Sequence, residues 1–328
     1  MKIAVLGAGA WGTAISINLC ARHAVTLWAR DAALLATMRA AGVNQRYLPG
    51  FPLPAALALA GELAQALKGA ELVLAAVTTN GLRDTLKRLS ATGRSAPLVW
   101  LCKGFESERA KLPHQICAEE LPASVPRAVL SGPSFAEEVA RELPAALTLA
   151  SSDAAFARTA APALHGPTLR IYLSEDVTGV EVGGAVKNVM AIAAGISDGL
   201  GLGLSARAAL ITRGLAEMTR LGIALGGRPE TFMGLAGAGD LILTCTGDLS
   251  RNRRVGLALA RGTPLAAALA QLGHTAEGVY TARAVTRLAE GLKVDMPITR
   301  AVCRVLDDPG QARAAVQELL AREQKSEY

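Results

Sequence analysis

The chain has 328 residues, of which 51% are hydrophobic, 4% aromatic and 19% charged, and its formal net charge is +6. This length exceeds what one hydrophobic core usually serves, so we expect two domains. The most apolar segments are short and interrupted, and the N-terminus lacks the features of a signal peptide, so we expect a soluble, cytoplasmic protein without stable membrane insertion. The positive charge suits a small anionic ligand, but basic residues do not alternate with aromatic ones, and we expect no binding to nucleic acid.

The five cysteines and four histidines predict neither a disulfide framework nor a metal site. The cysteines are odd in number, no two have Cys-x-x-Cys spacing, and the histidines are isolated from one another. We therefore expect no metal in this protein. These residues are Cys20, Cys102, Cys117, Cys245 and Cys303, and His23, His114, His165 and His274.

The chain opens with the pattern of a dinucleotide-binding unit. Residues 2–6 form an apolar, partly β-branched run that predicts a buried parallel strand. This run leads into the segment 7–12, which has the spacing G-x-G-x-x-G, and then into a predicted helix at about 13–22, with a second strand at 25–28. A glycine-rich turn without a ligand is the alternative, but the order of strand, motif and helix favours a dinucleotide site.

The three glycines of this segment have separate roles in such a site. Gly7 would permit a tight turn, Gly9 would let a pyrophosphate approach the backbone, and Gly12 would let the helix pack closely on the strand. The amides of Ala10, Trp11 and Gly12 lie at the N-terminus of the predicted helix. They would therefore face the negative charge of the ligand.

The end of the second strand is the expected contact for the adenosine ribose. Arg30 and Asp31 stand there. An arginine accommodates a 2′-phosphate, whereas a carboxylate hydrogen-bonds a free ribose hydroxyl. Because Arg30 comes first, we expect NADPH to be preferred, with NADH as the second cofactor. Asp31 is either the N-cap of the next helix or a ribose ligand itself.

Apolar strands and helices continue to alternate along the first half of the chain. This alternation predicts an α/β, Rossmann-type, doubly wound parallel sheet with helices on both faces. We expect a loop at residues 44–54, strands at 71–77, 97–102, 128–130, 145–150 and 169–173, and a helix at 81–89.

Two polar residues follow predicted strands, at the edge of the sheet where ligands bind. Lys103 comes directly after the strand 97–102 and offers a positive charge, and Ser134 follows the strand 128–130 and offers a hydroxyl. Each residue also has a simpler interpretation. Lys103 is then a solvated lysine, and Ser134 is a helix N-cap that forms a capping box with Glu137.

From about residue 176, strand-like runs stop and long Ala and Leu segments with helical spacing continue to the end. We therefore predict a dinucleotide-binding domain at residues 1–176 and an all-helical substrate and catalytic domain at 177–328. One predicted helix from Ser205 shows a clear apolar stripe with charged residues off it. The stripe is Leu210, Ile211, Leu215, Met218 and Leu221, and the charged residues are Arg213, Glu217 and Arg220.

Three segments of the helical half carry unusual polar residues. Lys187 and Asn188 lie among small or apolar residues, where a partly buried lysine needs a partner or a task. Asp240 follows the glycine-rich segment 234–239, and its simpler interpretation is a helix N-cap. Residues 250–254, Ser-Arg-Asn-Arg-Arg, form a basic patch that is otherwise a solvated surface.

Together these motifs resemble the NAD(P)-dependent sn-glycerol-3-phosphate dehydrogenases, and most closely the bacterial biosynthetic form. The resemblance spans nearly the whole chain and implies a helical C-terminal domain like that of 6-phosphogluconate dehydrogenase. The motifs that carry it, in chain order, are Gly7 to Thr13, Tyr47 to Pro49, Lys103-Gly104, Gly132 to Ser134, Gly183 to Asn188, Gly237 to Asp240, Arg251-Asn252 and Glu277-Gly278.

The resemblance implies that dihydroxyacetone phosphate is reduced to sn-glycerol 3-phosphate, which supplies glycerophospholipid synthesis. Since the cofactor carries the hydride, the protein positions the carbonyl, supplies a proton and holds the phosphate. Lys187 would be the proton donor in reduction and the base in the reverse direction. Asp240 would orient its ammonium, and Asn188 would hydrogen-bond substrate oxygens. Burial and Lys103 would lower the pKa of Lys187, whereas Asp240 and the phosphate would raise it, so the direction stays open.

The resemblance also assigns binding residues. Arg251 and Asn252 would take the phosphate, because a guanidinium makes two-pronged contacts with its oxygens. Ala10 stands where family members often carry Ser or Thr, which removes a hydroxyl contact to the pyrophosphate and leaves the backbone amide. The implied substrate residues are Lys103, Gly132, Ser134, Lys187, Asp240, Ser250, Arg251 and Asn252. The implied cofactor residues are Gly7, Gly9, Ala10, Trp11, Gly12, Arg30, Lys103, Ala136, Arg251 and Glu277.

Two other functions stay open at this point. A dehydrogenase of the same architecture that acts on a small keto or hydroxy acid could use Arg251 for a carboxylate. A nicotinamide-binding sensor without turnover would need neither Lys187 nor Asp240, which argues against it. The resemblance further implies a homodimer.

Overall fold

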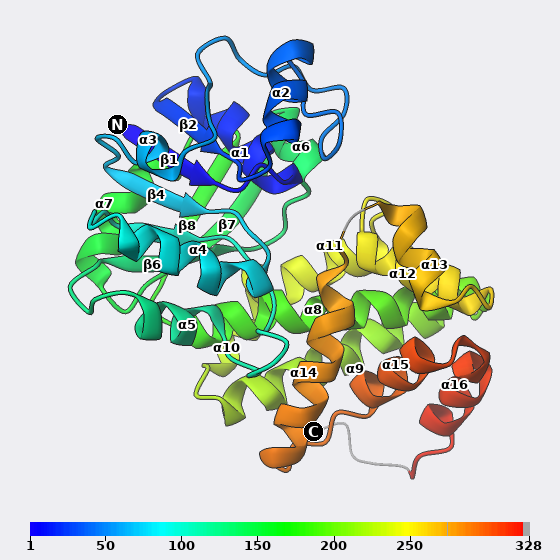
Figure 1. The fold of residues 1–328 in the computed structure, drawn as a ribbon. Helices are drawn as coiled ribbons and strands as arrows, with labels where there is room; N and C mark the ends of the chain where they lie inside the picture. Colours follow the sequence, from blue (N-terminus) through cyan, green and yellow to red (C-terminus); the bar gives the residue numbers. More distant parts are fainter. Residues whose placement is uncertain (274, 324–328) are drawn as a thin grey trace.

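An eight-stranded sheet organises the first half of the chain in the computed structural model, which describes residues 1–273 and 275–323 (Figure 1). The strand order is β3-β2-β1-β4-β5-β6-β7-β8, so the chain starts inside the sheet and builds outward in both directions, as in a doubly wound fold. The three-residue edge strand β3 was not predicted. The strands are β1 (Lys2–Leu6), β2 (Ala24–Trp28), β3 (Ala58–Ala60), β4 (Leu72–Ala75), β5 (Leu98–Trp100), β6 (Arg127–Ser131), β7 (Ala145–Ala150) and β8 (Leu169–Ser174).

The last two strands run opposite to the others, which corrects the expectation of a wholly parallel sheet. β7 pairs antiparallel with β6, and β8 pairs parallel with β7. The connection from Ser131 to Ala145 contains only the five-residue helix α6 (Ala136–Ala140). Such a helix spans roughly 7 Å, which is less than half the length of a five-residue strand. The chain therefore does not return past β6 before β7 begins.

Both faces of the sheet are apolar and covered by helices. Along β1, Ile3 and Val5 belong to one buried cluster, and Ala4 and Leu6 belong to another. Since neighbouring strand residues point to opposite faces, each cluster marks one face. The first cluster includes residues of α1 (Ala10–Cys20), α2 (Ala32–Ala41) and α7 (Ala154–Leu164), and the second includes residues of α3 (Leu63–Ala66), α4 (Thr79–Ala91) and α5 (Pro113–Glu120).

From Val177 onward the described chain is helical, and one long helix, α8, runs through its middle with α14 crossing in front (Figure 1). A single apolar cluster joins these helices. The helices are α8 (Val177–Gly199), α9 (Gly203–Ala224), α10 (Pro229–Met233), the π-helical turn η1 (Leu235–Gly239), α11 (Asp240–Thr246), α12 (Arg251–Ala260), α13 (Leu265–Leu272), α14 (Glu277–Gly291), α15 (Pro297–Asp307), the 3₁₀ turn η2 (Pro309–Gln311) and α16 (Ala312–Leu320).

α8 is long and apolar enough to cross a bilayer by length and composition, contrary to the expectation that no segment would approach this limit. Its most apolar 18-residue window has a mean hydropathy of 1.2, and all of that window is buried inside the protein. The apolar surface of α8 is therefore covered by the other helices and by the sheet. Its composition is that of a core helix, which the hydropathy of a sequence alone does not distinguish from a membrane span.

α8 and α12 approach each other closely because glycines face each other at their contact. A Cβ on Gly195 would clash with the backbone oxygen of Arg253, and one on Gly256 would clash with the backbone oxygen of Ile192. Any larger residue would push the two helices apart. The start of α12 is thereby held at a fixed place beside α8.

Glu217 was expected on the exposed side of α9 but is 1% exposed. Its carboxylate accepts hydrogen bonds from the amides of Ile298, at 2.6 Å, and Thr299, at 3.3 Å, in the first turn of α15. A helix N-terminus has free amides and a partial positive charge, so a buried carboxylate finds partners there. Burial nevertheless raises the pKa of Glu217 to about 7, against these hydrogen bonds.

Glu217→Gln should become more stable relative to the wild type as pH rises from about 4.5 to about 7. The raised pKa means that the folded wild type binds a proton that the unfolded chain has released in this range, so wild-type stability falls as pH rises. The relative change should reach about 3 kcal/mol. Urea unfolding of both proteins across this range measures it, and a difference that does not vary with pH would contradict the expectation.

Candidate active site

The glycine-rich turn has the backbone geometry of a pyrophosphate cradle. Gly7 has a φ of +114°, which L residues rarely adopt, and its amide donates to the oxygen of Trp28 at 2.9 Å. A Cβ on Gly12 would clash with the oxygen of Gly7, whereas nothing lies within 4 Å of a Cβ built on Gly9. The first helix begins at Ala10 without a side-chain cap. The turn therefore fits a dinucleotide, with open space at Gly9 and uncapped amides behind it.

Asp31 caps the helix that follows the second strand. Its side chain accepts a hydrogen bond from the amide of Leu34 at 3.0 Å. The N-cap interpretation of Asp31 is therefore correct. Arg30, beside it, is exposed at the end of β2.

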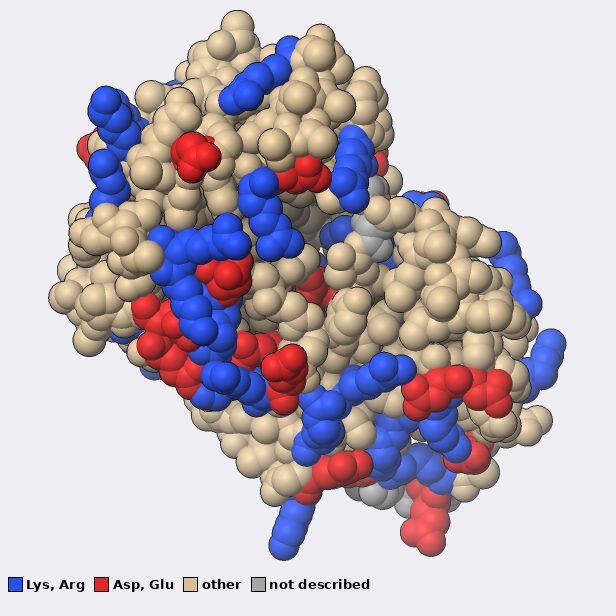
Figure 2. Space-filling view, viewed as in Figure 1, with Lys and Arg blue, Asp and Glu red and all other residues tan. Residues whose placement is uncertain are grey.

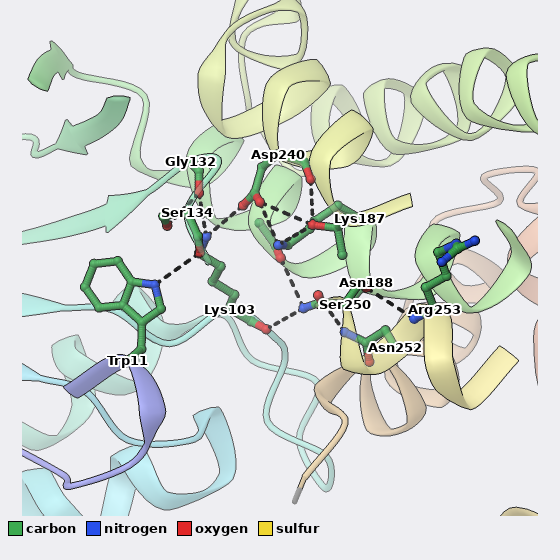
Figure 3. Close-up of polar contacts among 12 residues, drawn as sticks. Trp11, Lys103, Gly132, Ser134, Lys187, Asn188, Asp240, Ser250, Asn252 and Arg253 are labelled. Atoms are coloured by element: carbon green, nitrogen blue, oxygen red, sulfur yellow. Dashed lines mark hydrogen bonds and ion pairs between the residues drawn. The ribbon is translucent and has the colours of Figure 1, made fainter. Parts of the chain in front are cut away.

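Two lysines from different halves of the chain meet on one carboxylate (Figure 3). Lys103, after β5, donates to Asp240 Oδ2 at 2.7 Å, and Lys187, in α8, donates to Asp240 Oδ1 at 2.7 Å. Asp240 is the first residue of α11 and points toward both ammonium groups, so its interpretation as an N-cap is wrong. Lys103 is likewise no solvated lysine, because its side chain is 16% exposed.

Burial and charge set the protonation of this group. Burial lowers the pKa of Lys187 to about 8, and the positive charge of Lys103 acts in the same direction, while Asp240 opposes both. Burial disfavours the Asp240 carboxylate, but the two ammonium groups outweigh burial and hold its pKa below the usual value. The direction that the sequence left open for Lys187 is therefore downward, toward neutral pH.

The segment after β6 surrounds the head of Lys103. Gly132 has a φ of +136° and its oxygen accepts from Lys103 Nζ at 2.8 Å. Ser134 Oγ donates to the same oxygen at 3.2 Å, and the Ser134 oxygen accepts from the Trp11 indole at 3.3 Å. The alternative interpretation of Ser134 as the N-cap of a capping box is wrong, because α6 starts at Ala136 and its N-cap is Phe135, which lacks a side-chain cap. Trp11, Ser134 and Lys103 thus connect the glycine-rich turn to the lysine pair.

Two buried amides link four segments around the lysines. Asn188 Nδ2 donates to the Lys103 oxygen at 3.2 Å, and Asn252 Nδ2 donates to Asn188 Oδ1 at 2.9 Å. The amide of Gly278 donates to Asn252 Oδ1 at 3.0 Å. This chain of hydrogen bonds joins the loop after β5 to α8, α12 and α14. The two side chains expected to bind substrate therefore also hold the site together.

The basic patch at the start of α12 divides into two parts. Ser250 caps the helix by accepting from the Arg253 amide at 3.2 Å. The Arg253 guanidinium donates twice to Asp198 of α8, at 2.9 and 2.7 Å, and once to Asp248 at 2.8 Å. Arg251 is exposed. Arg253 therefore anchors the helix, and Arg251 remains available to a ligand.

Glu277 lies at the start of α14, within electrostatic reach of Arg251. Burial raises the pKa of Glu277 to about 7, while Arg251 and a hydrogen bond from the Thr79 backbone lower it. Its Oε1 atom is buried and has no hydrogen-bond partner among the described residues. An unpaired buried oxygen is costly, so a ligand that donates a hydrogen bond fits this position.

The surface is hollowed between the sheet-bearing part and the helical part, with basic side chains around the hollow (Figure 2). Within residues 1–273 and 275–323, no group of three or more His, Cys, Asp or Glu side chains is placed to hold a metal ion. His274 lies outside the described residues.

Comparisons with known proteins decide the family. The family models described as the N-terminus and the C-terminus of NAD-dependent glycerol-3-phosphate dehydrogenase match residues 2–157 and 176–317. The glycerol-3-phosphate dehydrogenase (NAD(P)+) of Nitrosospira multiformis is 60% identical over 331 residues, covering 100% of this chain and 99% of the relative. The chain belongs to the NAD-dependent glycerol-3-phosphate dehydrogenase family. The family resemblance inferred from the motifs is confirmed.

Two further members of the family match this chain over nearly its full length. The enzyme of the same name from Thiobacillus denitrificans is 60% identical over 328 residues and covers 100% of both chains. The crystal structure of glycerol-3-phosphate dehydrogenase from Coxiella burnetii has a TM-score of 0.93 at 45% identity, and the match covers 98% of this chain and 99% of that one. The expected Rossmann-type sheet followed by a helical part is thereby confirmed as the fold of the family.

Thr244 belongs to the site but was not predicted. Its Oγ1 accepts from Lys187 Nζ at 2.8 Å and donates to the Asp240 backbone oxygen at 2.6 Å. Thr244 lies four residues after Asp240 in α11, so both side chains occupy one face of the helix. That spacing was a readable signal. The pairing of Arg253 with Asp198 was also not predicted, because it joins residues far apart in the sequence.

Thr244→Val replaces the hydroxyl by a methyl group, which leaves one hydrogen of the buried Lys187 ammonium without its acceptor. The free energy of unfolding should therefore fall by about 1–3 kcal/mol. Urea unfolding at neutral pH measures this change. Thr244→Ser keeps the hydroxyl and should unfold much closer to the wild type. A Val variant as stable as the wild type would show that the hydroxyl contributes nothing.

Proposed function

We propose that this protein reduces dihydroxyacetone phosphate to sn-glycerol 3-phosphate with NAD(P)H. The observation that carries the proposal is the buried Lys187 ammonium, held on Asp240 beside the edge of the sheet to which the glycine-rich turn belongs. The cofactor, when bound, supplies the hydride for the ketone carbon. Membership of the family supports this choice of substrate.

Lys187 gives its proton to the ketone oxygen during reduction and removes it in the reverse direction. A pKa of about 8 suits both roles, because a general acid and base works best when its pKa lies near the working pH. Asp240 orients the ammonium, and Lys103, on the other carboxylate oxygen, adds positive charge near the developing alkoxide.

Arg251 holds the substrate phosphate at the start of α12. The guanidinium matches phosphate oxygens, and the helix N-terminus adds a partial positive charge. Ser250 and Asn252 are the neighbours of Arg251 at the start of α12, and Gly132 and Ser134 lie beside the ammonium group of Lys103. Arg253 is paired with Asp198, so of these two arginines it is Arg251 that contacts the phosphate.

NADPH is the preferred cofactor and NADH the second. Arg30 at the end of β2 supports this preference, since a guanidinium there binds a 2′-phosphate.

Residues 1–176 form the dinucleotide-binding domain and 177–328 the helical substrate domain. Gly7, Gly9, Ala10, Trp11, Gly12, Arg30, Lys103, Ala136, Arg251 and Glu277 contact the cofactor. The enzyme works in the cytoplasm as a homodimer and supplies glycerol 3-phosphate for glycerophospholipid synthesis.

A spectrophotometric assay tests the proposal directly. Oxidation of NADPH and of NADH, at matched concentrations, is followed with dihydroxyacetone phosphate, with unphosphorylated dihydroxyacetone and with small keto acids. We expect fast turnover with the phosphorylated ketone only. A preference for a keto acid would overturn the substrate, and binding of NADPH without turnover of any ketone would overturn the enzymatic function.

The kcat/KM for reduction should fall as pH rises above about 8, and the kcat/KM for oxidation of glycerol 3-phosphate should rise through the same pH. The two directions need opposite protonation states of Lys187, whose pKa is about 8.

Lys187→Met should lose turnover by about 100-fold or more while still binding NADPH. Initial rates and cofactor fluorescence measure these effects. A variant with near wild-type rates would place the proton donor elsewhere.

Arg251→Ala should raise the KM for dihydroxyacetone phosphate by about tenfold to 100-fold, as expected for loss of a charged hydrogen bond to phosphate. Arg254→Ala, which removes an exposed arginine from the same helix, is the matched control and should keep the wild-type KM. If neither variant changes the KM for dihydroxyacetone phosphate, the patch at 250–254 is a solvated surface.

A further inference from the structure

The geometry points to Arg46 as a specificity-determining residue that favours NADPH over NADH by engaging the carboxylate of Asp31. Arg46 lies in the loop between α2 and β3, outside the glycine-rich turn. The inference rests on the proposed function in one respect, because it needs a nicotinamide dinucleotide on the glycine-rich turn.

The loop that carries Arg46 is fixed to the dinucleotide turn. Asn44 is fully buried, and its Nδ2 donates to the Ala8 oxygen at 2.9 Å and to Thr13 Oγ1 at 2.8 Å. Leu48 is 1% exposed and packs in a small apolar cluster with Ala14 of α1. Arg46 therefore lies between two residues of its loop that contact the glycine-rich turn and α1.

Asp31 is fixed to the same place from the other side. The Gly7 amide donates to the Trp28 oxygen, which holds the end of β2 against the turn. One carboxylate oxygen of Asp31 caps α2 through the Leu34 amide. The other oxygen, Oδ2, lies 3.4 Å from Arg46 Nη1. Both oxygens of Asp31 are therefore engaged by the protein.

The Arg46 guanidinium has a second contact that limits its freedom. It lies over the Tyr47 ring, 5.1 Å from the centroid, which is a cation–π distance. The side chains of Arg46 and Asp31 are 58% and 44% exposed, so a ligand can reach both. The pair is thus held in place and open to solvent at the end of β2.

The two cofactors differ in the group at the 2′ position of the adenosine ribose, which would lie near Asp31 and Arg46. NADH carries a ribose 2′-hydroxyl, which a free carboxylate accepts, whereas NADPH carries a 2′-phosphate, which a free carboxylate repels. Arg46 offsets the charge of Asp31 and occupies the oxygen that a hydroxyl would use. Together with Arg30 it also makes the local charge positive, so both effects favour the phosphate.

The test measures dissociation constants of NADPH and NADH by cofactor fluorescence, without turnover. Arg46→Met should lower the preference for NADPH by about fivefold, which is the scale of an exposed charge contact. Asp31→Asn, which keeps a capping side chain, should raise the preference. In the double variant, loss of Arg46 should have a smaller effect than it has beside Asp31.

Arg88→Met is the matched control. It removes an arginine of similar exposure from an ion pair with Asp84 on α4 of the same sheet-bearing part, and it should leave the preference unchanged. The Arg46→Met effect should also shrink at about 0.5 M salt, because exposed charges are screened there.

An unchanged ratio of the two constants in Arg46→Met, or the same change in Arg88→Met, would overturn the inference while leaving the proposed function intact. Failure of the wild type to bind either cofactor would overturn both. Use of a ratio removes general effects on folding, since both cofactors need the same folded turn.

Discussion

The contact on which the site depends is one buried carboxylate shared by two ammonium groups. Asp240 receives Lys103 from the loop after β5 and Lys187 from α8, so it joins the sheet to the helices at the place of the proposed chemistry. Removing one partner from a buried ion pair typically costs about 3–5 kcal/mol, because the remaining charge is left unpaired. The hydrogen bonds of Asn188 and Asn252 fix the backbone of Lys103 relative to α8 and α12, next to these three charged groups.

The same group carries an excess of positive charge. Two cations share one anion in a place where Lys187 is 8% exposed, and this imbalance, together with burial, makes the ammonium easier to deprotonate. A substrate with negative charge restores the balance and is therefore attracted to the site. The charge imbalance that helps to lower the pKa of Lys187 would thus also favour a negatively charged ligand.

Local patterns were predicted well, and contacts between distant segments were not. Gly7 and Gly12 were readable because their backbone geometry tolerates little else. Glu217 was misplaced because helical periodicity treats a carboxylate as exposed, whereas its partners are amides of a helix some eighty residues later. The anchoring role of Arg253 was missed for the same reason, since its partner Asp198 lies in another helix. The reversal of β7 depends on how far a short connection reaches, which the strand pattern does not show.

The glycine contact between α8 and α12 has a mechanical consequence. The two backbones are in close contact at Gly195 and Gly256, and the Arg253 guanidinium joins the helices again through Asp198, so α8 and α12 are held together at two places. The proposed proton donor, Lys187, lies on α8, and the proposed phosphate-binding residue, Arg251, lies on α12. The contacts between the two helices therefore also set the spacing between these two side chains, and with it the distance from ketone oxygen to phosphate that a bound substrate would have to match.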